Sequence, residues 1–239
     1  IQAPRGRVLR DGQNKGLPAR LNEIVRLAKG ELVARMDADD AMHPLRLEKQ
    51  VGFLQANPEL DGVTTGAYLI DAEDRPIALL PGRQPSAQEV LARGGFLHPS
   101  LLARKSWFEA HPYSLDYPRA EDRELFVRTF KTSRLHVLSE PLYFYRWFGV
   151  PRGKTLRIGY RSERKVMWKY GPNLVGWGPS LRLIALSFGK ELLTWFLEWT
   201  HLEKGFQTRR AFQPLLEMDQ REALRTLKVI RETCVPGWD

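Results

Sequence analysis

Apolar and polar residues repeat with two different periods along the first part of the chain. Between positions 18 and 30, apolar residues recur every three or four positions after a proline and before a glycine, which predicts a helix. Residues 31–36 alternate instead and predict a strand that runs into an acidic cluster. A second helical pattern spans 44–57. The apolar face of this second helix is expected to comprise Leu47, Val51 and Leu54.

The middle of the chain continues with strands, turns and helices. β-branched and aromatic residues predict a strand over 62–70, and the turn at 71–76 predicts a second strand paired with it. The remaining patterns predict a short helix over 86–92, a strand over 97–103, an irregular loop over 107–119, a helix over 121–130 with Leu125 and Phe126 facing inward, and strands over 135–138 and 142–147. Strands and helices that follow one another in this way are typical of an α/β fold.

The pattern changes near Val150, where the chain becomes basic and is interrupted by glycine and proline. We predict a domain of residues 1–150 followed by a basic, mainly helical extension of residues 151–239. Helices are expected over 181–200 and 214–232. The first of them has an apolar stripe made of Ile184, Phe188, Leu192, Trp195, Phe196 and Trp199. Such a stripe packs on a domain core or rests in a bilayer interface, and the sequence leaves both alternatives open.

The composition of the 239-residue chain indicates a folded, basic protein. Hydrophobic residues make up 43% of it, enough for a sizeable core, and the net charge is +9. Ten basic and two acidic residues lie between Lys131 and Tyr170, so this segment should attract phosphates, nucleic acid or anionic lipid. Cys234 is the only cysteine, which excludes an internal disulfide and favours a reducing compartment.

No secretory signal opens the chain, and its first residues resemble a truncated start. The longest apolar region, 181–199, contains four charged residues and makes a poor membrane span. We therefore expect a cytoplasmic location, with peripheral contact at the inner face of the cell membrane as an additional expectation.

Three aspartates, Asp37, Asp39 and Asp40, come directly after the first predicted strand. Ligands gather beyond the carboxyl ends of strands in open α/β sheets, and clustered carboxylates there bridge a hard divalent cation to nucleotide phosphates. A structural alternative is that the aspartates solubilise the turn or cap the next helix. An EF-hand is excluded, because Ala41 and Met42 replace an oxygen ligand and the required turn glycine.

Two other functions compete for these features. Phosphatases of the haloacid dehalogenase type also carry Asp-x-Asp after a strand, and Asp37 would be their nucleophile, but Ala41 stands where that family typically has Thr or Val. A non-enzymatic alternative is a basic nucleic-acid-binding protein that uses residues 131–169. We expect no nucleic-acid partner, because no ordered platform of aromatic residues for base stacking is apparent.

Two blocks of motifs decide between these alternatives. The first comprises residues 14–22, 28–31, 36–40 and 43–48, and the second comprises residues 98–102, 120–125 and 142–146. Together they resemble the family 2 glycosyltransferases, nucleotide-sugar enzymes of the GT-A fold, in the family's order from about Asn14 to Arg146. The resemblance implies an α/β fold of GT-A type, with a mixed sheet flanked by helices and a helical C-terminal extension. It also implies that the N-terminal strands of the nucleotide-binding half are missing.

The resemblance further implies an inverting transfer, in which an acceptor hydroxyl attacks the anomeric carbon opposite the diphosphate leaving group. A divalent cation, Mn²⁺ or Mg²⁺, would offset charge on the leaving group, and a carboxylate would take the hydroxyl proton. Carried over by position, Asp39 is the main metal ligand, Asp37 lies toward the ribose or metal, and Asp40 is an accessory ligand. Asp122, paired with Glu121, is the general base. The structural alternative for this pair is ordinary helix N-terminal charge.

Three further residues match the family at the edges of the site. Arg20 and Asn22 match donor-side positions, and an arginine there could reach the diphosphate, although a solvated helix face is an equal alternative. His98 is expected to contact the metal or phosphate, or else to serve as a structural hydrogen-bonding residue.

The expected function is metal-dependent hexosyl transfer from a nucleotide sugar to a hydroxyl of a glycan or lipid-linked saccharide in cell-envelope polysaccharide synthesis. A UDP-sugar is the expected donor. Because the chain begins after the family's first strands, we expect the isolated 239 residues to bind nucleotide sugar weakly or not at all.

Overall fold

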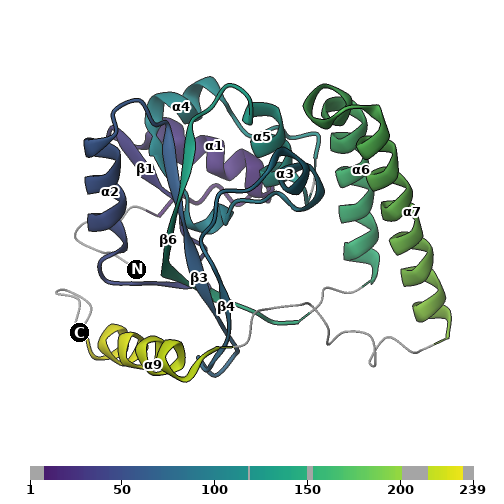
Figure 1. The fold of residues 1–239 in the computed structure, drawn as a ribbon. Coiled ribbons are helices and arrows are strands. Elements are labelled where there is room, and N and C mark those ends of the chain that lie inside the picture. The colour runs from purple at the N-terminus through teal and green to yellow at the C-terminus, as the bar shows by residue number, and fades with distance from the viewer. Residues whose placement is uncertain (1–7, 118, 150–152, 201–214, 234–239) are drawn as a thin grey trace.

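The computed structural model describes residues 8–117, 119–149, 153–200 and 215–233, and shows a mixed sheet with helices on both faces (Figure 1). The sheet of the described residues has six strands: β1 (Leu32–Ala34), β2 (Ala41–Met42), β3 (Gly62–Ile70), β4 (Pro76–Leu80), β5 (Leu102–Arg104) and β6 (Leu135–Arg146). Its order is β1, β5, β3, β6 and β2, with β4 paired to β3. The β3–β6 pair is parallel, and the other pairs are antiparallel.

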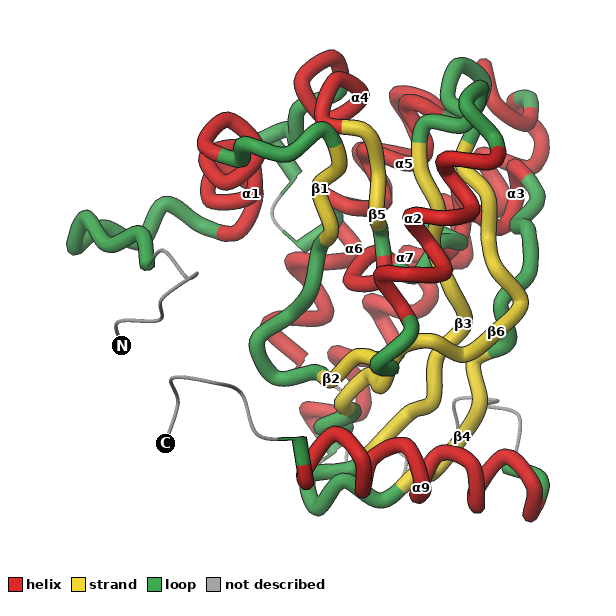
Figure 2. The backbone as a smooth tube through the Cα atoms, turned by 90° about the vertical axis from the view of Figure 1, so that its left-hand side faces the viewer, coloured by secondary structure: helices red, strands yellow, loops and turns green. Residues whose placement is uncertain are grey.

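The helices are α1 (Leu17–Leu27), α2 (Arg46–Ala56), α3 (Ala87–Arg93), α4 (Lys105–Ala110), α5 (Glu121–Thr129), α6 (Gly153–Val175), α7 (Trp177–Trp199) and α9 (Glu217–Glu232), with a 3-10 turn η1 (His98–Ser100). Figure 2 shows α2 on one face of the sheet and α5, α6 and α7 behind the other face. The sheet is therefore a middle layer between α2 and the helices α5, α6 and α7.

Each face of the sheet has its own hydrophobic core. Under α2, the buried residues are Leu54, Val63 and Leu102. The larger core on the opposite face joins α3, α5 and α6, and includes Val90, Leu91, Leu125, Phe126, Val166 and Met167. A third cluster holds α9 against the far end of the sheet through Tyr68, Ile70, Phe144, Ala223 and Leu227.

Several predicted elements are confirmed. The strand predicted over 62–70 is β3, and its predicted partner after the acidic turn is β4. The first predicted helix is α1, and the helix predicted over 121–130 is α5, whose two predicted inward residues are buried. The short predicted helix is α3, which begins with a capping box between Ser86 and Glu89.

Other predictions are wrong in detail. The strand predicted over 97–103 is the turn η1 followed by the short strand β5, because Pro99 lacks the N–H that a strand ladder needs. The loop predicted over 107–119 begins inside α4. The two strands predicted after residue 134 form one strand, β6, whose register against β3 shifts beside Gly66.

The buried face of α2 also differs from the prediction. Leu54 is buried as expected, but Leu47 is exposed and Val51 is partly buried. Arg46 and Gln50 are buried in their place, and the arginine Nε donates to the glutamine Oε1 over 2.9 Å. The pair also donates to three backbone carbonyl oxygens, those of Arg35, Val63 and Ser100.

The C-terminal extension is helical as expected, but it starts earlier than the apolar pattern indicates. α6 occupies the basic segment, and Pro172 lies within its last turns instead of ending it. α6 and α7 form a helical pair that lies beyond α3 and α5 in Figure 1. The predicted boundary near Val150, and the first residue of the helix predicted over 214–232, lie outside the described residues.

Membrane-spanning potential is a separate property of these helices. None of the helices in the described ranges combines the length and the hydrophobicity that crossing a bilayer requires.

Candidate active site

The acidic turn links β1 to the short strand β2. Backbone pairing fixes both of its ends: Arg35 donates its N–H to the Leu101 carbonyl oxygen over 2.8 Å, and β2 pairs with β6 at Met42 and Tyr143. Strand β2, which the sequence pattern does not reveal, therefore brings the aspartates of the turn beside the end of β6.

Two residues of β6 hold Asp40. The Tyr143 hydroxyl donates to its carboxylate over 2.8 Å, and the Arg146 backbone N–H donates over 2.7 Å. Burial raises the pKa of Asp40, while these two hydrogen bonds oppose the rise. Arg146 also donates from Nε to the Asp39 carbonyl oxygen over 2.7 Å, so β6 fixes the turn through both side chain and backbone.

The same arginine connects the acidic turn to more distant parts of the fold. Arg146 Nη2 pairs with Asp74 in the β3–β4 turn over 2.5 Å, and Asp74 also pairs with Arg231 of α9 over 2.7 Å. Both pairings lower the pKa of Asp74, with the Arg231 hydrogen bond as the largest cause. One carboxylate thus joins β6 and α9.

The carboxylate of Asp37 feels the charges of several neighbouring residues. Its carboxylate pairs with Arg35 Nη2 over 2.7 Å and is partly buried. Burial raises its pKa, the Arg35 charge opposes this, and the charges of Asp39 and Asp122 raise it further. The charge of Asp122 thus acts on Asp37, although the two residues lie in different motif blocks.

The N-terminus of α5 carries the predicted acid pair. Glu121 is buried, and its pKa is raised by burial and next by the charge of Asp122. Asp122 is partly exposed, and its Oδ1 accepts the Arg123 backbone N–H over 2.7 Å. Acidic side chains at the N-terminus of a helix also stabilise the helix electrostatically. Glu121 and Asp122 can therefore stabilise α5 and have a chemical role as well.

Arg35 is a candidate site residue that the sequence reasoning missed. Its side chain is 7% exposed, and its charge lowers the pKa values of Asp37 and Glu121. Within the described residues its Nε and Nη1 atoms are buried without a hydrogen-bond partner. A basic residue just before an acidic cluster at a strand end is the sequence signal that could have revealed it.

His98 is enclosed by protein side chains, including Tyr113 and Phe126. Its Nε2 lies 2.7 Å from the Tyr113 hydroxyl, and its ring is buried. Burial and then the Arg35 charge hold its pKa well below the usual value, so the ring is neutral. This environment favours the hydrogen-bonding alternative over a contact with metal or phosphate.

The two predicted donor-side residues on α1 are engaged with protein groups. Arg20 pairs with Asp11 and Glu23. Asn22 accepts the Tyr113 backbone N–H and donates to the Tyr113 carbonyl oxygen, each over 2.9 Å. Asn22 therefore positions the tyrosine that contacts His98, using one hydrogen bond at its amide oxygen and one at its amide nitrogen.

The acidic turn is the candidate binding place for the divalent cation that the resemblance implies. Within the described ranges, no group of three or more His, Cys, Asp or Glu side chains is arranged to hold a metal. The donor chemistry nevertheless fits a hard divalent ion, since all three side chains are carboxylates. The charge of Asp39 raises the pKa of Asp37, and the charges of Asp39 and Asp37 raise that of Asp40. Asp39 is exposed, and no described residue bonds to its carboxylate, which leaves it available.

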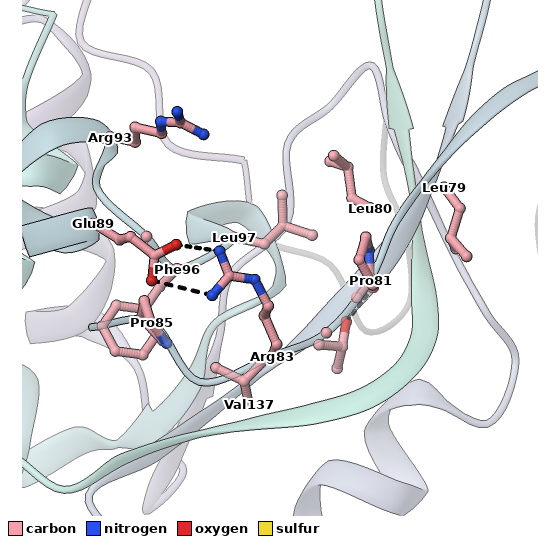
Figure 3. A pocket seen from close by; sticks show the side chains of 14 residues that line it. Leu79, Leu80, Pro81, Arg83, Pro85, Glu89, Arg93, Phe96, Leu97 and Val137 are labelled. Carbon is pink, nitrogen blue, oxygen red and sulfur yellow. Dashed lines mark hydrogen bonds and ion pairs between the residues drawn. The ribbon is translucent and has the colours of Figure 1, made fainter. Parts of the chain in front are cut away.

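A separate hollow of about 420 Å³ lies between the β3–β4 hairpin and α3 (Figure 3). Arg83 and Glu89 form an ion pair across it, and Arg93 and Phe96 also line it. None of the predicted site residues belongs to its lining. The candidate active site is consequently the region around Asp37 and Asp122, and not this hollow.

Comparisons with known proteins bear on the first half of the chain. Residues 2–115 match the family model described as Glycosyl transferase family 2. EpsE of Bacillus subtilis (strain 168) is 32% identical over 146 residues, which cover 59% of this chain and 52% of EpsE. The O-antigen biosynthesis glycosyltransferase WbnJ of Escherichia coli is 33% identical over 131 residues, which cover 53% of this chain and 51% of WbnJ. The chain spans about half the length of these curated relatives.

Two solved structures are similar over larger parts of the chain. S. aureus TarS 1-349 in complex with UDP has 15% identity and a TM-score of 0.46, covering 70% of this chain and 48% of that one. The mannosyltransferase PcManGT from Pyrobaculum calidifontis, in complex with GDP-Man and Mn²⁺, has 14% identity and a TM-score of 0.47, covering 92% and 66%. The mixed sheet flanked by helices agrees with the expected GT-A architecture. Residues 2–115 are thus similar to glycosyltransferase family 2, and the relatives named here are glycosyltransferases.

Proposed function

We propose that the protein transfers a hexosyl group from a nucleotide sugar to a hydroxyl of a glycan or lipid-linked saccharide, in polysaccharide synthesis. The family match over residues 2–115 supports the transferase class over a phosphatase or a nucleic-acid-binding protein. The names of WbnJ and of the amylovoran biosynthesis glycosyltransferase AmsE of Erwinia amylovora, 37% identical over 62 residues, support a polysaccharide pathway.

One observation carries the mechanism: the charge of Asp122 acts on Asp37, although the two residues belong to different motif blocks. A reacting sugar needs both a place for its diphosphate and a base for the acceptor. In this proposal Asp122 accepts the proton of the acceptor hydroxyl as that oxygen bonds to the anomeric carbon. The bond from this carbon to the diphosphate oxygen breaks with inversion, and the diphosphate leaves with the electron pair.

The acidic turn would supply the other half of the site. Asp39, with Asp37 beside it, would hold Mn²⁺ or Mg²⁺, which when bound offsets charge on the diphosphate. Asp40 contributes by holding the turn to β6 through Tyr143 and Arg146. Arg35, with two N–H directions unpartnered among the described residues, is a further candidate to meet an anionic oxygen.

The roles of Glu121, Arg20, Asn22 and His98 follow from their contacts. Glu121 lies buried behind Asp122 and tunes the local charge. Asn22 and His98 would position Tyr113, which lies against the same site. Arg20 would bind a phosphate of the donor only if its ion pair with Asp11 broke.

The test is a screen of nucleotide sugars with Mn²⁺ or Mg²⁺, following release of the nucleoside diphosphate, and a comparison of Asp122→Asn with Asp116→Asn. Asp116 is exposed in the loop that precedes α5 and serves as the matched acidic control. We expect Asp122→Asn to lower the transfer rate by at least about 100-fold and to leave nucleotide binding unchanged. Full turnover by Asp122→Asn would assign the base elsewhere.

A further inference from the structure

Part of the contact between α6 and α7 is made by buried polar residues, whereas such contacts are apolar in an ordinary surface hairpin. Ser187 and Glu191 of α7 are buried, and they face arginines of α6. Arg164 donates to both, while Arg161 pairs with Glu191 over 3.3 Å. Polar residues of a surface helix normally point to water and its apolar residues point inward. Here ion pairs fill much of the seam between the two helices.

The outer side of α7 is correspondingly apolar. Figure 1 shows α7 as the outermost helix of the pair. The large apolar residues exposed on α7 are Trp177, Leu181, Leu186, Phe188, Leu192, Leu193, Trp195, Phe196 and Trp199. Trp199 is 78% exposed and Leu192 is 69% exposed, and on α6 Trp168 is 61% exposed next to Trp177. A continuous apolar face of this kind marks a surface that binds something.

The exposed charge around this apolar face is entirely positive. Between residues 153 and 200 the acidic residues are Glu163, Glu191 and Glu198, and each is held in an ion pair with an arginine. The exposed basic side chains of the same segment are Lys154, Arg161, Lys165, Lys169, Arg182 and Lys190. Of these, only Arg161 is held in an ion pair within the described residues, so five cations stay available to an anionic partner.

We propose that the α6–α7 pair binds the surface of an anionic phospholipid bilayer, with the outer face of α7 inserted among the lipid headgroups. Exposed tryptophans suit this depth, because their rings are apolar while the indole N–H finds polar groups. Lysines and arginines at the rim meet lipid phosphates, their aliphatic stems lying along the apolar surface. The helices lie on the membrane and do not cross it.

Charge argues against a second copy of the chain as the occupant. In a two-fold dimer the same patch meets itself, so the basic rims of the two copies would face each other. The acidic residues that could neutralise them are already paired inside each hairpin. An anionic membrane supplies the missing negative charge.

The hairpin is attached directly to the helix that carries the proposed base. Arg123 of α5 pairs with Glu163 of α6 over 2.9 Å, and the Tyr170 hydroxyl of α6 donates to Glu124 of α5 over 2.7 Å. Membrane contact through α7 would therefore hold Asp122 at a fixed height above the lipid surface. This consequence rests on the proposed function and suits a lipid-linked acceptor, whereas membrane binding itself does not depend on transfer activity.

The experiment is flotation of the 239-residue chain with phosphatidylcholine vesicles and with vesicles that also contain phosphatidylglycerol. We expect strong binding to the anionic vesicles, weak binding to the neutral ones, and a decrease as salt is raised. Leu192→Ser combined with Phe196→Ser should lower binding at least tenfold, since both side chains are exposed on α7. Leu115→Ser, an equally exposed apolar residue in the loop before α5, is the matched control and should bind like the unchanged chain.

Two further measurements keep the result interpretable. Circular dichroism checks that the double variant stays folded, and quenching of tryptophan fluorescence by brominated lipid reports insertion directly. Absence of binding to anionic vesicles by the unchanged chain would overturn the proposal. So would a concentration-dependent dimer that the double variant abolishes while vesicle binding persists, because the face would then belong to a second copy. Loss of transfer by Asp122→Asn with vesicle binding intact would separate this inference from the proposed function.

Discussion

The Tyr143 hydroxyl donates to the Asp40 carboxylate over 2.8 Å and accepts the Asp37 backbone N–H over 3.2 Å. Burial keeps the pKa of Tyr143 far above its usual value, so the hydroxyl remains a donor at every physiological pH. A single side chain from β6 thus holds both ends of the turn that carries the proposed metal ligands.

Tyr143→Phe removes both of these hydrogen bonds. We expect it to lower the free energy of unfolding by about 1–2 kcal/mol and to raise the pKa of Asp40 further, since the hydroxyl hydrogen bond lowers that pKa. Urea unfolding measures the first effect. Tyr160→Phe is the control, because no described residue bonds to its hydroxyl. Identical unfolding midpoints for the two variants would contradict the assigned role.

Asp39→Ala tests the proposed cation site. The carboxylate is exposed and unbonded among the described residues, so its loss should change the free energy of unfolding by no more than about 0.5 kcal/mol. We expect Mn²⁺ to raise the melting temperature of the unchanged chain and EDTA to reverse the rise. The rise should disappear in Asp39→Ala and persist in Asp116→Ala. A cation response that is absent from the unchanged chain, or equal in all three proteins, refutes the site.

The raised pKa of Asp37 has a definite sign in the dependence of stability on pH. A carboxyl whose pKa is higher in the folded than in the unfolded chain binds its proton more tightly when folded. Its destabilising effect is therefore absent below the unfolded value of 3.8, grows as the pH rises past it, and is complete above the folded value. Asp37→Asn should reduce the fall in unfolding free energy between about pH 4 and pH 7.

Denaturant unfolding across this pH range makes the comparison, with exposed Asp116→Asn as the control. Asp37→Asn also removes the partner of Arg35, so the slope with pH, and not the absolute stability, is the quantity to compare. If the variant's unfolding free energy changes with pH as steeply as that of the unchanged chain, the pKa of Asp37 is not raised in the folded protein.

Gln50→Leu tests the polar network under α2. The change leaves the carbonyl oxygens of Val63 and Ser100 without their donor, and Arg46 Nε without its acceptor. We expect a loss of about 3 kcal/mol of unfolding free energy, since unsatisfied buried groups each cost about 1–3 kcal/mol. Gln55→Leu on the exposed side of the same helix should have little effect. Equal midpoints for both variants would refute the network's importance.

The parts of the fold that sequence patterns predict well are those where local preference and tertiary contacts agree. β3 is buried along its whole length and all its residues except Leu69 are β-branched, aromatic or small, so pattern and structure coincide. α2 shows the opposite case, since Arg46 and Gln50 occupy the inward face that apolar spacing assigns to Leu47 and Val51. Hydrogen bonds to backbone carbonyls, which spacing cannot reveal, decide which side of that helix is buried.

The helices missed after residue 104 have a related explanation. In α4 the two buried aromatics, Trp107 and Phe108, are adjacent, so no helical period is visible. The inward face of α6 includes Gly153, Ser162 and Gly171, small residues that read as breaks in a basic segment. Packing against α3 and α5 stabilises this helix despite its weak apolar pattern.

The acids of the candidate site stay a prediction, which rests on motif order in a family that the chain resembles. The structure adds that the charge of Asp122 acts on Asp37. The contacts of Arg35, Tyr143 and Arg146 depend on how β2 pairs with β6 and how β1 meets η1, both set by long-range backbone geometry. No local pattern encodes that geometry.

The double pairing of Asp74 makes the last described helix part of the active-site framework. Lifting α9 away from β4 would withdraw Arg231 and leave Arg146 as the sole cation on that carboxylate, and Arg146 is the residue that grips the acidic turn. A change that displaces α9 should therefore also loosen the acidic turn, although α9 contributes no residue to it.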